Sequence, residues 1–123
     1  MKNTKEKNKN APKILHAPTS FSGQPTAIVR QLRRRGYAAD QIHYTSTGSH
    51  PLGYALDKTY TGTVPDQVKA LKDSLESGYD IYHFWQKSLL YRLDYSTPTG
   101  LDLPIIKAHG ASIVQRFTGF DLR

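Results

Sequence analysis

The feature that most constrains the fold of this chain is an alternation of short apolar segments with longer amphipathic ones. Four short segments are typical of buried strands, at residues 13–17, 41–45, 80–85 and 112–117. Three amphipathic segments between them predict helices, at 25–35, 65–77 and 103–108, and a glycine follows each, at positions 36, 78 and 110. Strands that alternate with helices predict an α/β fold, a Rossmann-like parallel sheet flanked by helices.

The spacing of apolar residues also predicts which side of each helix packs on the sheet. In the first helix the apolar side consists of Pro25, Ile28, Val29 and Leu32. In the second helix it consists of Val68, Leu71 and Leu75. Arg30, Arg33 and Arg34 fall outside the first apolar stripe, so we expect them on the solvent side of that helix.

Three stretches are less regular. Residues 46–62 are rich in Thr, Gly, Pro and Tyr without a clear period, so we interpret them as a loop, with a short strand as the alternative. Ser88 to Leu93 is compatible with a short helix. Asp102 precedes the apolar residues of the third helix, where its side chain can cap the helix.

Charge divides the chain into a tail and a domain. Residues 1–11 are rich in Lys and Asn and lack large apolar side chains beyond the first residue, so we expect a disordered basic tail followed by one domain at 12–123. The net charge of +7 comes largely from this tail and from the arginines at 30–35. Such clusters favour an anionic membrane surface or nucleic acid, but a solvated tail and helix face explain them as well. Without a nucleic-acid-binding motif we expect no nucleic acid partner.

Several classes of function are not expected. The chain has no cysteine, and its five histidines lack metal-ligand spacing, so we expect no metal site. Neither G-x-G-x-x-G nor G-x-x-x-x-G-K is present, and we expect no cofactor. No apolar run approaches the roughly 18 residues of a membrane span, and no apolar stretch of a secretory signal follows the N-terminal lysines. We expect a cytoplasmic protein, with contact to the inner membrane face as an open alternative.

Polar side chains near the ends of predicted strands are the candidate functional residues. His16 and His83 lie near strand ends, where α/β sheets bind ligands, and either can bind a hydroxyl or act as an acid–base group. Structural histidines are the alternative. Asp121 and Arg123 follow the last strand and can bind a hydroxyl and a phosphate, or form a surface ion pair.

Two further features have a functional and a structural interpretation. Gly23 lies between a strand and a helix N-terminus, where backbone N–H groups and the helix dipole can bind a phosphate, although a plain turn also needs a small residue. The aromatic residues Tyr82, Phe84 and Trp85 can stack on a ring-shaped ligand or belong to the core.

Three motifs appear in a fixed order. The first is Lys13 to Pro18, a loop with Ser22-Gly23-Gln24-Pro25, and a helix that ends in Leu32-Arg33-Arg34-Arg35-Gly36. The second is Tyr79-Asp80-Ile81-Tyr82-His83, and the third is 102–107 followed by Phe117-Thr118-Gly119-Phe120-Asp121-Leu122-Arg123. Together, over residues 13–123, they resemble the opening of the N-terminal, acceptor-side domain of GT-B glycosyltransferases of the retaining, nucleotide-sugar-dependent type. The second motif is similar to the family's Y-D-I-x-H strand, and the third to its F-H-G-S-D-x-R segment.

The resemblance implies the truncated first half of a GT-B fold, from a protein that passes a sugar from a nucleotide sugar to a glycan or lipid acceptor, as in polysaccharide biosynthesis. It implies that Gly23 faces the donor diphosphate, that His16, Asp121 and Arg123 lie on the acceptor side, and that His83 and Asp121 are catalytic candidates. Nothing matches the family's donor-binding domain with its paired glutamates.

Two of the motifs depart from the family pattern. Many relatives have two glycines in the first loop, where this chain has Gly23 alone. Many relatives have a catalytic histidine before the glycine of the last motif, where this chain has Thr118. We therefore expect no sugar transfer by this chain alone. The alternative function is a stand-alone Rossmann-like module that binds an anionic ligand or partner through the arginines of the first helix.

Overall fold

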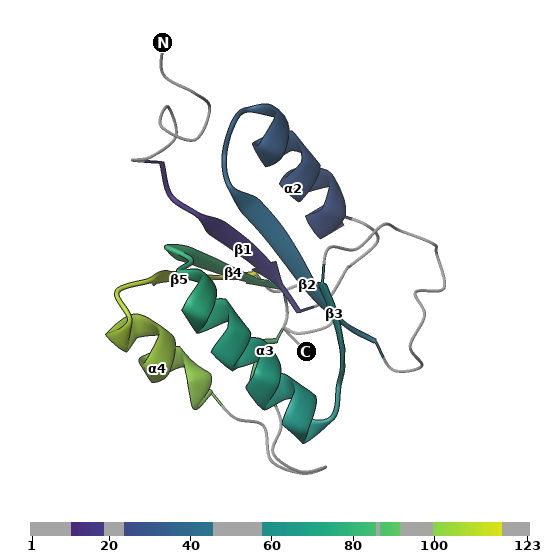
Figure 1. The fold of residues 1–123 in the computed structure, drawn as a ribbon, viewed down its shortest axis with the longest axis vertical. Coiled ribbons are helices and arrows are strands. Elements are labelled where there is room, and N and C mark those ends of the chain that lie inside the picture. The colour runs from purple at the N-terminus through teal and green to yellow at the C-terminus, as the bar shows by residue number, and fades with distance from the viewer. Residues whose placement is uncertain (1–10, 19–23, 46–57, 86, 92–99, 117–123) are drawn as a thin grey trace.

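The structure is a computed structural model, and it describes residues 11–18, 24–45, 58–85, 87–91 and 100–116. Within them the chain forms five strands and three helices (Figure 1). In chain order these are β1 (Ile14–Ala17), α2 (Gln24–Arg34), β2 (Ala39–Thr45), β3 (Lys58–Thr61), α3 (Val64–Ser77), β4 (Ile81–Trp85), α4 (Asp102–Ala108) and β5 (Ser112–Arg116). Residues 1–10 of the predicted tail lie outside the described residues.

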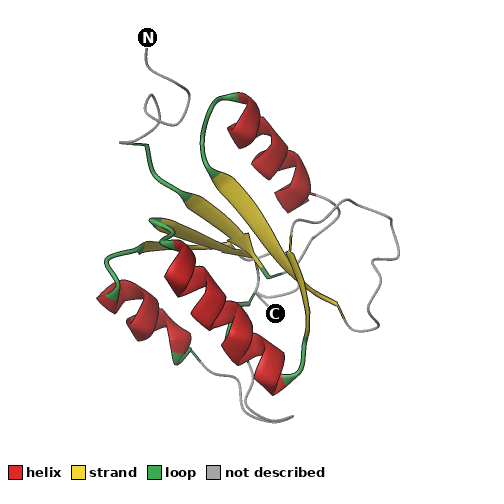
Figure 2. Cartoon of the chain, in the orientation of Figure 1, coloured by secondary structure: helices red, strands yellow, loops and turns green. Residues whose placement is uncertain are grey.

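The strands form one parallel sheet in the order β3-β2-β1-β4-β5. Helix α2 lies on one face of the sheet, and α3 and α4 lie on the other (Figure 2). The predicted α/β, Rossmann-like sheet is therefore confirmed, with all four predicted strands parallel to their neighbours. β3 is the short strand that the sequence left open within 46–62, and it forms one edge of the sheet.

The main core fills the space between the sheet and helices α3 and α4. Leu15, Ile42 and Phe84 are buried there from three adjacent strands, together with Leu71 of α3 and Ile106 of α4. Tyr82 points to the same side, because its hydroxyl bonds Ser74 of α3 over 3.0 Å. Parallel strands in which alternate apolar residues face a helix layer are typical of this fold class.

Helix α2 packs on the opposite face, mainly against β2 and less against β1. Pro25, Thr26 and Val29 are buried, and the Thr26 hydroxyl donates to Oε1 of Gln41 on β2 over 2.8 Å. Ile28 and Leu32, which the sequence placed in the same buried stripe, are only half-buried. The apolar stripe of α2 is thus wider than its contact with the sheet.

The buried side of α3 differs from the predicted one. Leu71 is buried and Leu75 packs against the core, but Val68 is 49% exposed, so its predicted place in the core is wrong. Gln67 and Ser74 are buried instead. The Gln67 amide donates to the Gly62 carbonyl over 2.8 Å, and Ser74 accepts from Tyr82, so both polar groups have partners. An apolar pattern cannot reveal buried polar residues of this kind.

Glycines end the helices as predicted. Gly78 adopts a left-handed conformation with φ 75° and its N–H donates to the Leu75 carbonyl, which closes the last turn of α3. Gly36 and Gly110 also have positive φ, 91° and 85°. A side chain at such positions would strain the backbone, which explains why glycine marks the boundaries reliably.

The predicted helix at Ser88–Leu93 is wrong where it can be tested, because residues 88–91 form no helix and the others lie outside the described residues. The backbone of this segment bonds to side chains instead. The Leu90 N–H donates to Oδ2 of Asp102 over 3.0 Å, and the Leu89 carbonyl accepts from the Tyr44 hydroxyl. Asp102 is therefore not a cap: it is the first residue of α4, and its completely buried carboxylate also accepts from Ser88.

Candidate functional site

The strand order identifies one position in the sheet where a ligand is expected. Chain connections from β1 lead outward on one side to β2 and β3, whereas β4 and β5 lie on its other side. The order therefore reverses between β1 and β4. In open α/β sheets, ligands bind outside the carboxyl ends of the strands at such a point.

A row of rings stands at this position. His16 is paired in register with His83 of the neighbouring strand, and their ring centroids are 4.5 Å apart and stacked. His83 stacks in turn on Trp85, two residues along β4, at 5.4 Å. The guanidinium of Arg116 at the end of β5 lies 4.6 Å from the centre of the Trp85 ring. We call His16, His83, Trp85 and Arg116 the histidine row.

One hydrogen bond fixes the inner half of this row. The indole N–H of Trp85 donates to Nδ1 of His16 over 2.9 Å. Because Nδ1 accepts, the proton of the neutral His16 ring must be on Nε2. His16 and Trp85 are 2% and 1% exposed, so they support the row from within.

Both histidines are held in the neutral form. Burial, together with smaller contributions from the neighbouring His83 and Arg116, lowers the pKa of His16 from 6.5 to about 3. Burial also lowers the pKa of His83, again helped by the positive charge of Arg116. Desolvation and a nearby cation both disfavour the charged imidazolium, so the two causes act in the same direction.

The outer half of the row consists of His83, whose Nε2 does not reach the surface, and Arg116, which does. His83 is half-buried and Arg116 is exposed. Nε2 of His83 is a buried atom without a hydrogen-bond partner among the described residues. A neutral ring nitrogen can accept from or donate to a ligand hydroxyl, and the guanidinium beside it can bind an anionic group.

Two of the sequence-predicted site residues, His16 and His83, are brought together in this way. Gly23, Asp121 and Arg123 lie outside the described residues, as does Thr118. Of the aromatic cluster, Tyr82 and Phe84 belong to the core against α3 and α4, as the structural interpretation required. Trp85 is buried too, but on the opposite face, within the histidine row.

Arg116 and the bond between Trp85 and His16 were not predicted. The signal was present in the period-2 alternation of strands: His83 and Trp85 share a face of β4, as Val114 and Arg116 share a face of β5. Only the register, which pairs Trp85 with Arg116, brings these residues together. The sequence alone does not determine that register.

The arginines of α2 form the other candidate site. Arg30, Arg33 and Arg34 are exposed, as predicted. Arg33 is engaged within the chain, because its Nε donates to the Ala39 carbonyl over 2.7 Å and its Nη2 lies 3.1 Å from Oδ1 of Asp40. It joins the end of α2 to the start of β2, which leaves less of this cluster for a ligand.

Other kinds of site find no support in the described part of the chain. There, no group of three or more His, Asp or Glu side chains is placed to hold a metal ion. No helix in the same residues is both long and apolar enough to cross a bilayer. Comparison of the chain with protein-family models, with curated proteins and with solved structures finds no match.

Proposed function

We propose that this chain is the acceptor-side, Rossmann-like part of a GT-B glycosyltransferase. In the complete protein a sugar would pass from a nucleotide sugar to a glycan or lipid acceptor. One observation supports this above all: two neutral histidines, His16 and His83, are stacked on the two strands between which the strand order reverses, His16 near the carboxyl end of β1 and His83 in the middle of β4. The three sequence motifs over 13–123 are the second support.

The outer members of the histidine row would contact the ligand. Nε2 of His83 would bond a sugar hydroxyl, and a neutral imidazole is also the form that can take a proton from that hydroxyl. Arg116 would bind a charged group of the donor or acceptor. His16 and Trp85 would hold the His83 ring in place through stacking and their shared hydrogen bond.

The remaining predicted residues extend the same site in this proposal. Gly23 directly precedes α2, which begins at Gln24, so the N–H groups of that helix start would face the donor diphosphate. Asp121 and Arg123 follow β5, the strand that carries Arg116, and would complete the acceptor side. Each assignment of these three residues rests on the sequence motifs.

Calorimetric titration with nucleoside diphosphates tests the proposal. We expect weak, saturable binding of at least one of uridine, guanosine and adenosine diphosphate, and tighter binding than of the parent nucleoside. Replacing His83 with Gln should weaken this binding about 10-fold if the ring nitrogen makes a hydrogen bond of ordinary strength. Arg34→Gln is the matched control on the outside of α2, and it should leave binding unchanged.

A transfer assay completes the test. With radiolabelled nucleotide sugars and glycan or lipid acceptors, we expect no turnover by this chain alone, because positioning by a second domain supplies roughly 7–11 kcal/mol of a typical barrier reduction. Saturable transfer that disappears in His83→Gln would contradict the fragment interpretation. Binding that is lost in Arg34→Gln but kept in His83→Gln would favour the stand-alone anion-binding module instead.

A further inference from the structure

The two faces of the sheet are covered unequally. On the face opposite α3 and α4, helix α2 covers β2 and part of β1. On that same face, Ile81 and His83 of β4 are in register with Ser112 and Val114 of β5. Val114 is 45% exposed and Ser112 is exposed. Parallel sheets are normally buried on both faces, so an exposed apolar half-face is a candidate for binding another element.

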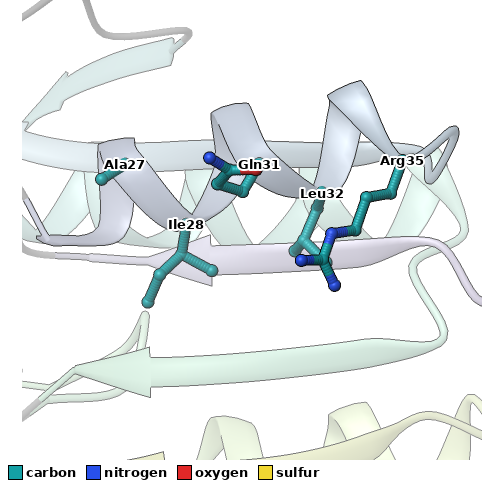
Figure 3. A pocket seen from close by; sticks show the side chains of 5 residues that line it. All are labelled: Ala27, Ile28, Gln31, Leu32 and Arg35. Carbon is teal, nitrogen blue, oxygen red and sulfur yellow. The ribbon is translucent and has the colours of Figure 1, made fainter.

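Helix α2 continues this surface. A hollow of about 320 Å³ runs along its side and is lined by Ala27, Ile28, Gln31, Leu32 and Arg35. Figure 3 shows Ile28 and Leu32 pointing from α2 toward the sheet. The half-buried apolar residues of α2 and the exposed Val114 of β5 therefore lie on the same face of the sheet, and we call this surface the open groove.

The charges around the open groove have one sign. Neither α2, with the sequence QPTAIVRQLRR, nor β4 and β5 contain Asp or Glu. Arg35 is exposed at the end of α2, and Arg116 is exposed at the end of β5. The acidic residues of α3 and α4, including Asp66, Asp73 and Asp102, belong to elements on the opposite face.

We propose that the open groove binds an amphipathic helix of a separate protein that carries carboxylates beside its apolar stripe. The apolar stripe would cover Ile28, Leu32 and Val114, which is how helices complete parallel sheets. The carboxylates would pair with Arg35 and Arg116, and such pairs set the orientation of a partner. This proposal does not depend on the proposed function.

The fold also sets the spacing of those carboxylates. α2 runs back from the carboxyl edge of the sheet to its amino edge, where Arg33 bonds the first residue of β2, so Arg35 and Arg116 lie at opposite edges. A five-residue strand such as β4 spans about 16 Å. A helix covers that length in about 11 residues. Eleven residues also complete about three turns, so the first and last side chains point to nearly the same side of the helix.

Selection from a display library tests this inference. The library holds helical peptides of about 18 residues, roughly 27 Å long, with a fixed Leu/Ala stripe and randomised flanks. We expect enrichment of Asp or Glu at two flanking positions about 11 residues apart. The selected peptide should bind the chain at least about 10-fold more tightly than a copy with Gln at those positions, a difference of about 1.4 kcal/mol.

Variants locate the binding surface. Val114→Asp and Arg35→Glu should each weaken peptide binding about 10-fold or more, whereas Arg30→Glu on the outside of α2 should have little effect. Circular dichroism and urea denaturation confirm that each variant folds. The inference is overturned by a selection without acidic enrichment, or by binding that Val114→Asp leaves unchanged.

Two other occupants are tested in parallel. Vesicles of phosphatidylserine in phosphatidylcholine should not compete with the peptide, since a flat anionic surface would contact Arg30 and Arg34 rather than the groove. Sedimentation should show either no self-association of the chain or self-association that Val114→Asp does not change. Competition by the vesicles, or such self-association, would assign the groove to a membrane or to a second copy and overturn the proposal.

Discussion

The two faces of the sheet are built from the same strands and yet differ in almost every physical respect. One face carries Leu15, Ile42 and Phe84 into a layer closed by α3 and α4. The other carries His16 and Trp85, and it is covered by α2 over only part of its width. The difference between adjacent residues is sharpest in β4, where Phe84 belongs to the first face and Trp85 to the second.

The two faces therefore contribute differently to the stability of the fold. The closed face is apolar and supplies most of the free energy of folding, since stability follows the apolar area removed from water. The open face contains polar rings whose placement costs stability below the ordinary histidine pKa of 6.5, because desolvation opposes their protonation. Groups with shifted pKa values are often found at binding sites, which favours the proposed ligand site on this face.

The largest effect should come from the closed face. Phe84→Ala removes a completely buried ring and should lower the free energy of unfolding by about 3–5 kcal/mol. Val114→Ala, on the open face, should lower it by about 0.5 kcal/mol, as expected for a surface position. Urea denaturation of both variants measures the contrast. Similar denaturation midpoints for the two variants would mean that the two faces contribute equally to stability.

Acid should destabilise the chain through the open face. The unfolded chain takes up a proton on His16 below the ordinary pKa of 6.5, whereas the folded chain resists protonation until about pH 3. Stability is therefore complete above pH 6.5 and is lost as pH falls, by about 1.4 kcal/mol for each unit. Two units below 6.5, the loss from this residue should reach about 3 kcal/mol.

Replacing His16 with Asn separates this effect from the titration of carboxylates. The amide oxygen can still accept from the Trp85 indole, but the side chain no longer titrates. We expect a shallower loss of stability between neutral and acid pH, measured by urea denaturation along a pH series. An unchanged slope would show that His16 is not the group responsible.

Asp102 tests how the closed face holds the segment after β4. Asp102→Ala leaves the Leu90 N–H and the Ser88 hydroxyl without their buried acceptor, which should cost about 1–3 kcal/mol. Asp102→Asn keeps an acceptor oxygen and should cost less. Denaturation midpoints decide, and equal losses for both variants would indicate that charge rather than hydrogen bonding matters.

The smallest effect concerns the arginines of α2. Arg33→Ala removes the bonds to Ala39 and Asp40 and should cost about 1 kcal/mol, whereas Arg34→Ala should stay within about 0.5 kcal/mol. Burial tends to raise the pKa of Asp40, but bonds from Tyr79 and Arg33 lower it overall, so the ion pair should persist to mildly acid pH. Equal losses in the free energy of unfolding for Arg33→Ala and Arg34→Ala would show that the bonds of Arg33 do not stabilise the chain.

Most of the fold could be predicted from the alternation of strand and helix patterns and from the glycines that follow the helices. The side-chain periods of strands and helices differ, and a positive φ favours glycine. The errors share one cause, namely side chains whose partners are remote in sequence. The apolar pattern placed Val68 in the core. Nothing in the sequence shows that Gln67 is buried instead, with its amide bonded to the Gly62 carbonyl. Residues 88–91 looked helical because the distant Tyr44 and Asp102 hold their backbone.

The candidate site was predictable to the same limited extent. The pattern alone placed each histidine on a predicted strand, although His83 lies in the middle of β4 rather than near its end. Their stacking, and the addition of Trp85 and Arg116, depends on strand order and register, which are properties of the assembled sheet.

We propose that the carboxyl ends of β1 and β4 form the ligand-binding edge, and chemical-shift mapping tests this proposal most directly. The indole N–H of Trp85 bonds His16 and is a reporter inside the histidine row. On titration of the chain with a nucleoside diphosphate, this resonance and those of His83 and Arg116 should shift together, and Val68 on the outside of α3 should not. Shifts confined to Arg30 and Arg34, or a silent Trp85 indole at saturating ligand, would contradict the claim.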